Sequence, residues 1–242
     1  MRGCLPSCCF VAWQGIAETA TVPLLPSSHD GAPRVGEMNI QQTVAWTWQA
    51  SPGLEVACLR EDTRGISVTG RVVTAMDDRV LQLDYRIGCD PGWIFRHLSA
   101  RCAFDGRVRE LNLRHDGEGW LANGVVRSDL VTAVDIDIMG TPLTNTLPIR
   151  RVPWTPGACR PFMMAYVQLP DLIVVPARQR YTALGSPGRF LYESLPGARA
   201  PSDNPRLPGH HGMNEAFTAE LEVDAHGLVV AYPPYWRRMA GC

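Results

Sequence analysis

The stretch Leu81-Gln82-Leu83-Asp84-Tyr85-Arg86-Ile87 decides the fold class of this sequence. Its odd positions are apolar and its even positions are polar. An extended chain with that pattern places one set of side chains against a core and the other set in water. The same alternation recurs over residues 134–138 and 217–224. Period two in three separate stretches predicts half-buried β-strands.

A weaker alternation covers residues 54–59, where Leu54, Val56 and Cys58 alternate with Glu55, Ala57 and Leu59. Further segments are strand-like by composition, namely residues 43–48, 66–73, 107–113, 120–126, 162–169, 172–175, 189–193 and 228–232. Turn residues separate many of them, such as Asp116-Gly117 and His226-Gly227. No window of a dozen residues has a helical period. The sequence therefore predicts an all-β fold of about a dozen strands in an antiparallel sheet, curled as a barrel, a half-barrel or a sandwich.

The strand-like pattern occupies residues 42–238, which we interpret as one domain. Residues 1–41 are rich in Pro and Gly without any period, and we interpret them as an unstructured extension. Met38 is an alternative start, and a secretory signal within residues 1–20 is a third interpretation of this region. The stretch 196–212 holds four prolines and three glycines, and we expect a loop insertion there.

Composition narrows the function classes. The formal net charge is −1 and no basic run occurs, which argues against nucleic acid as a partner. No apolar stretch reaches about 18 residues, so no transmembrane helix is expected. The eight cysteines include no C-x-x-C pair, and their scattered positions are typical of reduced thiols in a cytoplasmic protein.

The stretch 135–151 gathers most of the residues that could carry chemistry: Asp135, Asp137, Thr144, Asn145, Arg150 and Arg151. Two acids at i and i+2 on a strand share one face and lie about 7 Å apart. That separation suits the acid/base pair of an inverting glycosidase. It suits equally two structural acids paired with the arginines, or a set of ligand contacts. The arginines and amides could likewise bind sugar hydroxyls or a phosphate.

The run T-P-L-T-N-T-L-P-I-R-R at residues 141–151, with the upstream D-x-D, resembles the signature of the bacterial family called putative glycolipid-binding proteins. Three further segments match: the stretch 171–181, which contains Gln179 and Tyr181, the C-D-x-x-W element at 89–93, and the closing strands near 221–233. The chain departs from the family pattern in its extension, in its insertion, and at Val131-Thr132-Ala133, where a glycine and a cysteine are expected.

The resemblance implies a single curled antiparallel sheet, a β-roll similar in shape to the carriers of outer-membrane lipoproteins. It implies a glycolipid or another small amphipathic ligand in the concave face, in contact with Asp135, Asp137, Thr144, Asn145, Arg150, Arg151, Gln179 and Tyr181. Seven tryptophans and six tyrosines are available to fill a core or to contact sugar rings. Because a fold does not fix a function, this remains a hypothesis about the site.

Two other functions stay open. Asp135 and Asp137 could serve a carbohydrate- or lipid-modifying enzyme, and the domain could be a structural or interaction module. We assign no catalytic residue, no metal ligand and no cofactor. His210-His211 has no third ligand at metal-like spacing, and no nucleophile elbow, Walker loop or dinucleotide-binding motif is present. The oligomeric state cannot be deduced from these patterns.

Overall fold

The computed structural model describes residues 40–196 and 217–241. Residues 1–39 of the expected extension and residues 197–212 of the expected insertion lie outside this part, as does His210-His211. The first described strand begins at Ile40, two residues before the expected start of the domain.

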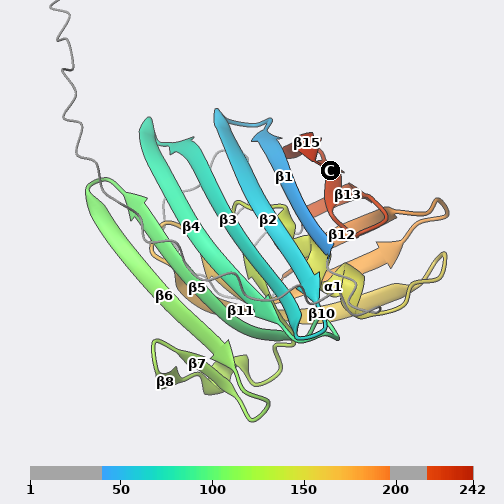
Figure 1. The fold of residues 1–242 in the computed structure, drawn as a ribbon, viewed down its shortest axis with the longest axis horizontal. Helices are drawn as coiled ribbons and strands as arrows, with labels where there is room; N and C mark the ends of the chain where they lie inside the picture. Colours follow the sequence, from blue (N-terminus) through green and yellow to red (C-terminus); the bar gives the residue numbers. More distant parts are fainter. Residues whose placement is uncertain (1–39, 197–216, 242) are drawn as a thin grey trace, which may run out of the picture. The chain divides into compact units, whose positions relative to one another are not determined.

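The described residues form one 15-stranded sheet, and Figure 1 shows its strands. The strands are β1 (Ile40–Trp48), β2 (Gly53–Asp62), β3 (Gly65–Met76), β4 (Arg79–Cys89), β5 (Phe95–Phe104), β6 (Arg107–His115), β7 (Trp120–Ala122), β8 (Val125–Val126), β9 (Asp135–Ile138), β10 (Cys159–Gln168), β11 (Ile173–Ala183), β12 (Arg189–Leu195), β13 (Phe217–Val223), β14 (Val229–Tyr232) and β15 (Trp236–Gly241). Two 3-10 turns, η1 (Ser128–Leu130) and η2 (Leu143–Asn145), and one helix, α1 (Thr146–Arg151), complete the described elements.

The sheet runs in the order β8-β7-β6-β5-β4-β3-β2-β1-β15-β14-β13-β12-β11-β10-β9. The prediction of a large curled β-sheet is confirmed, with fifteen strands instead of about a dozen. The antiparallel prediction holds for every pair except β9 and β10, which run parallel because a crossover through η2 and α1 connects them. The strand β1 pairs with β15 across most of the sequence, and Trp48 lies opposite Trp236.

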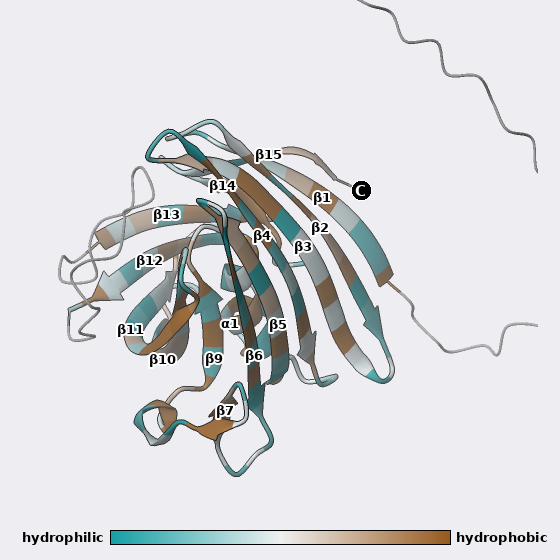
Figure 2. Cartoon of the chain, turned by 90° about the vertical axis from the view of Figure 1, so that its left-hand side faces the viewer, coloured by the Kyte–Doolittle hydropathy of each residue, from teal (hydrophilic) through white to brown (hydrophobic). Residues whose placement is uncertain are grey.

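The sheet curls so that β1–β6 and β9–β13 face each other across α1 (Figure 2). Its two edge strands, β8 and β9, do not pair with each other. The inner faces carry the core. Leu81, Leu83, Tyr85 and Ile87 are all buried, which confirms the alternation of the opening stretch. Exposed and buried residues likewise alternate along β13. The α1 segment carries Leu147 into the same core.

The weaker alternation of residues 54–59 is inverted. Glu55, Ala57 and Leu59 are buried, whereas Leu54 and Val56 are exposed on the outer face of β2. Which face of a strand is buried depends on its neighbours on each side of the sheet. A prediction from apolar content alone therefore selected the wrong face of β2. Glu55 can be buried because the hydroxyl groups of Tyr85 and Thr141, which are distant in the sequence, donate hydrogen bonds to it.

Three elements were not expected from the sequence. The strand β5 contributes small inward residues such as Ala100 and Cys102, and a register shift between Gly88 and Cys89 accompanies its pairing with β4, so its alternation is weak. The short β15 is rich in arginine, and its six residues are too few to show a period of two. The helix α1 spans only six residues and contains Pro148, so no helical period can show.

Candidate ligand-binding site

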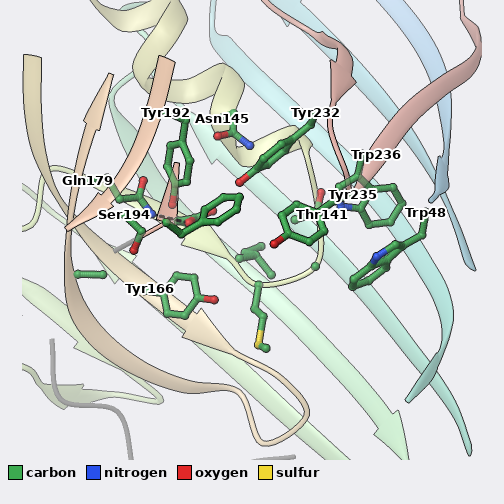
Figure 3. A pocket seen from close by; sticks show the side chains of 16 residues that line it. Trp48, Thr141, Asn145, Tyr166, Gln179, Tyr192, Ser194, Tyr232, Tyr235 and Trp236 are labelled. Carbon is green, nitrogen blue, oxygen red and sulfur yellow. Dashed lines mark hydrogen bonds between the residues drawn. The ribbon is translucent and has the colours of Figure 1, made fainter. Parts of the chain in front are cut away.

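A cavity of about 80 Å³ opens on the inner side of the sheet. Its lining is shared by both arms of the curl and by the segment that leads from β9 into η2. Figure 3 shows the lining side chains around this space. The described lining residues are Trp48, Asp137, Ile138, Met139, Gly140, Thr141, Asn145, Tyr166, Ala177, Gln179, Tyr192, Ser194, Phe217, Tyr232, Tyr235 and Trp236.

Aromatic rings form one wall of the cavity. The rings of Trp48 and Trp236 lie 4.7 Å apart because β1 and β15 place these residues opposite each other. The rings of Tyr232 and Tyr235 meet edge to face at 5.5 Å, and Tyr192 reaches Tyr232 at 6.0 Å. Such ring clusters offer flat apolar faces together with hydroxyl groups that reach the solvent or a ligand.

The opposite wall is polar and centres on Asp137. Thr144 Oγ1 donates a hydrogen bond to Asp137 Oδ1 at 2.7 Å, and Gln179 Nε2 donates one to Asp137 Oδ2 at 2.6 Å. Asn145 lies beside them, and its Oδ1 accepts a hydrogen bond from the Tyr181 hydroxyl at 2.9 Å. These bonds fix the rotamers of Gln179 and Asn145, so the polar wall is pre-organised before any ligand arrives.

One residue of the lining carries a buried donor without a partner. Trp48 Nε1 is buried and forms no hydrogen bond with any described residue. An unpaired buried N–H costs about 1–3 kcal/mol, so such groups in folded proteins are commonly bound by water or by a ligand. Trp48 lines the cavity beside amide and hydroxyl groups, so its indole is a candidate contact for a ligand.

The tyrosine hydroxyls of the cavity remain protonated over the whole physiological range. Burial raises the pKa of Tyr166, Tyr192 and Tyr232 well above the ordinary value, and the nearby Asp137 carboxylate raises each further. A protonated hydroxyl can both donate and accept a hydrogen bond. The cavity therefore presents groups of both kinds, which is what recognition of a hydroxyl-rich molecule requires.

The structure separates the eight residues predicted for the site into three groups. Asp137, Asn145 and Gln179 line the cavity. Thr144 and Tyr181 lie directly behind it and hold these residues through the hydrogen bonds described above. The remaining three, Asp135, Arg150 and Arg151, are not among the residues that line the cavity.

Asp135 and Arg151 pair with each other. Arg151 Nη1 lies 3.4 Å from Asp135 Oδ2 and donates a hydrogen bond to the Val134 carbonyl at 2.7 Å. Asp135 is fully buried, and burial raises its pKa to about 7 although Arg151 opposes the shift. Arg150 instead pairs with Glu61 at 3.2 Å and lies over the Trp93 ring. Because Asp135 is fully buried and does not line the cavity, Asp135 and Asp137 do not share an accessible site as an acid/base pair would.

Comparison with known families matches a model described as "putative glycolipid-binding" to residues 43–238. The chain belongs to this family. Its fold is also similar to a crystal structure, at 1.80 Å resolution, of a DUF1089 family protein from Pseudomonas aeruginosa. The two share 31% sequence identity and a TM-score of 0.62, over 76% of this chain and 92% of the other. No curated protein matches the chain.

Membership of the glycolipid-binding family supports a binding role at the level of the family. The described lining residues include no Arg, Lys or His, so the part of the cavity that the structure describes offers no cationic contact for a phosphate. Among residues 40–196 and 217–241, no group of three or more His, Cys, Asp and Glu could hold a metal ion. Within the same ranges, no helix is long and apolar enough to cross a membrane.

Sequence reasoning missed most of the aromatic wall of this family member. Trp48, Tyr192, Tyr232 and Trp236 come from four strands scattered over the chain, and nothing in the local pattern distinguishes them from core aromatics. It also missed Glu55, which lies behind Thr141. The one sequence signal for Glu55 was that an acid stood in a strand whose alternation did not decide which face is buried.

Proposed function

We propose that this chain binds a glycolipid or a related amphipathic molecule and holds the sugar head group in the cavity between the aromatic wall and Asp137. The observation that carries the proposal is a cavity that presents aromatic rings beside amide, carboxylate and hydroxyl groups, one of whose lining residues, Trp48, has an unpaired, buried indole N–H. Membership of the family described as "putative glycolipid-binding" also supports it.

The chemistry of the lining favours a sugar. Sugar rings present hydroxyl groups around their edges and apolar C–H groups on their faces. The amides of Gln179 and Asn145, with the neighbouring tyrosine hydroxyls, match the edges, whereas the indole rings of Trp48 and Trp236 match the faces. Arg150 and Arg151, which the sequence offered for a phosphate, are held by Glu61 and Asp135 instead.

The size of the cavity limits what it can enclose. Its volume of about 80 Å³ is far below the roughly 300–1,000 Å³ of pockets that enclose whole drug-sized ligands. We therefore assign only a compact head group to it and leave the acyl chains outside. A cytoplasmic location, predicted from the sequence, stays part of the proposal.

Calorimetric titration of the purified chain with dodecyl glucoside, which carries a single sugar and is kept below its micelle concentration, tests the proposal. Dodecyl phosphate supplies the same alkyl chain with an anionic head. We expect the glycoside to bind and the phosphate to bind more weakly. Trp48→Phe keeps an aromatic ring and removes one donor, and Gln179→Leu removes the amide. Each should weaken glycoside binding about tenfold, which corresponds to one hydrogen bond of ~1.4 kcal/mol.

Glu110→Gln, on the outer face of the sheet, is the control, because its side chain is 70% exposed and distant from the cavity lining. Equal affinities for the wild type, Trp48→Phe and Gln179→Leu would place binding elsewhere. Absence of binding to every glycoside tested, together with native mass spectra that show only empty protein from the original host, would overturn the proposal.

A further inference from the structure

Glu55 is a fully buried acid that the proposed binding role does not use. It lies on the inner face of β2 and does not line the cavity. Two hydroxyl groups bind it: the Tyr85 hydroxyl and Thr141 Oγ1 both donate to Glu55 Oε1, the latter at 2.8 Å. Its other oxygen, Oε2, has no hydrogen-bond partner among the described residues.

The backbone of β3 is adapted to this contact. Gly70 lies opposite Tyr85 in the β3–β4 pair and opposite Ala57 in the β2–β3 pair. A Cβ atom at Gly70 would lie 2.1 Å from the Tyr85 ring, closer than any real contact. The absence of a side chain at this position lets the ring cross β3 and deliver its hydroxyl to Glu55 on β2.

This arrangement fits an uncharged carboxylic acid. A carbonyl oxygen that accepts two hydroxyl hydrogens and a second oxygen that carries the proton need fewer partners than a buried carboxylate, which requires donors on both oxygens. Tyr85 is the one titratable group that faces Glu55 among the described residues, and no described Arg, Lys or His forms an ion pair with it. Burial accordingly raises the pKa of Glu55 to about 8.

Thr141 connects this acid to the cavity. Its Oγ1 accepts a hydrogen bond from the Leu143 amide at 3.0 Å, and the Pro142 carbonyl accepts one from Asn145 Nδ2 at 3.1 Å. The segment 141–145 thus spans the interior between Glu55 on β2 and Tyr181 on β11. Both Thr141 and Asn145 line the cavity.

We propose that Glu55 is a positioning residue for the cavity: its hydrogen bond with Thr141 anchors the segment 141–145, and loss of this acceptor frees the segment and weakens ligand binding. The part concerning ligand affinity rests on the proposed function, whereas the part concerning the segment does not.

Hydrogen exchange of the peptide that covers residues 139–145 tests the anchoring directly. After correction for intrinsic exchange, we expect Glu55→Leu, which removes both hydrogen bonds at similar volume, to lower the protection of this peptide about tenfold relative to the wild type. Glu55→Gln should keep most of the protection, because its amide oxygen still accepts the hydrogen bonds from Tyr85 and Thr141. Glu110→Gln is the matched control and should follow the wild type.

Titration with dodecyl glucoside supplies the second readout. Affinity should fall about tenfold in Glu55→Leu and stay close to that of the wild type in Glu55→Gln. Equal protection of the peptide in the wild type and in Glu55→Leu would overturn the inference. If no glycoside binds, the proposed function fails, while the exchange rates still decide the role of Glu55.

Discussion

Two buried carboxyl groups, Asp135 on β9 and Glu55 on β2, show opposite solutions to the same problem. Both are fully removed from solvent. Asp135 has the Arg151 guanidinium 3.4 Å away, whereas Glu55 has hydroxyl groups and no cation. Burial raises the pKa of both, to about 7 for Asp135 and about 8 for Glu55. A cation therefore keeps Asp135 closer to its charged form, and hydroxyl donors suit an acid that remains protonated.

The largest expected effect comes from removing the cation. Arg151→Met keeps most of the aliphatic stem and leaves Asp135 buried without a partner. At pH 8 we expect a loss of about 3 kcal/mol in the free energy of unfolding, since breaking a buried pair costs roughly 3–5 kcal/mol. The loss should shrink toward pH 6, because Asp135 can then take up a proton. Urea denaturation at the two pH values measures both quantities, and a loss independent of pH would argue that Arg151 acts through packing alone.

Gly70→Ala should cause the second-largest loss of stability. The added Cβ collides with the Tyr85 ring at 2.1 Å and displaces its hydroxyl from Glu55. Overpacking of this kind costs about 2 kcal/mol. Thermal unfolding measures the loss, and a Tyr85→Ala background should remove most of it. A similar loss in that background would assign the cost to the strand backbone instead of to the ring.

Glu55→Gln should have a smaller net effect of opposite sign. Between about pH 4.5 and pH 8 the folded protein holds a proton on Glu55 that the unfolded chain has released. Stability therefore falls as pH rises through this window, and the linkage is worth roughly 3 kcal/mol at pH 7. The amide N–H of the buried glutamine has no partner and destabilises the folded protein by about 1–3 kcal/mol. A net gain of about 1 kcal/mol in the free energy of unfolding therefore remains.

The sharper readout of Glu55→Gln is the slope of stability against pH. Between pH 7 and pH 8 Asp135 is already past its midpoint, so Glu55 dominates the contrast between the two acids. Denaturation at half-unit pH steps should show that slope in the wild type and a flatter one in Glu55→Gln. An unchanged slope would show that Glu55 is charged in the folded protein at neutral pH.

Arg150→Met should have the smallest effect and is the natural partner of Arg151→Met. Arg150 and Glu61 are each about one-quarter exposed, and such pairs contribute less than about 1 kcal/mol. The stem of the substituted side chain can still pack on Trp93. Urea denaturation should give a loss well below that of Arg151→Met. An equal loss would contradict the distinction between a partly exposed ion pair and a buried one.

The sequence predicted the fold correctly where a strand has one solvent-exposed face and one buried face, as in residues 81–87. It failed at β2, because the facing of Glu55 depends on hydroxyl groups 30 and 86 residues away. The signature block 141–151 was correctly singled out as unusual, but its geometry was not foreseen. The spacing in the sequence predicted that Asp135 and Asp137 share one face. In the structure Asp135 pairs with Arg151, whereas Asp137 lines the cavity.

The contact between Trp48 and Trp236 has a consequence for synthesis. These rings come from β1 and β15, so one side of the cavity combines residues that are synthesised far apart in time. Until β15 has been made, β1 has an unpaired edge, and apolar rings stay open to neighbouring chains. This wall of the cavity thus forms late, after Trp236 has emerged from the exit tunnel, and a chain truncated before that residue would lack it.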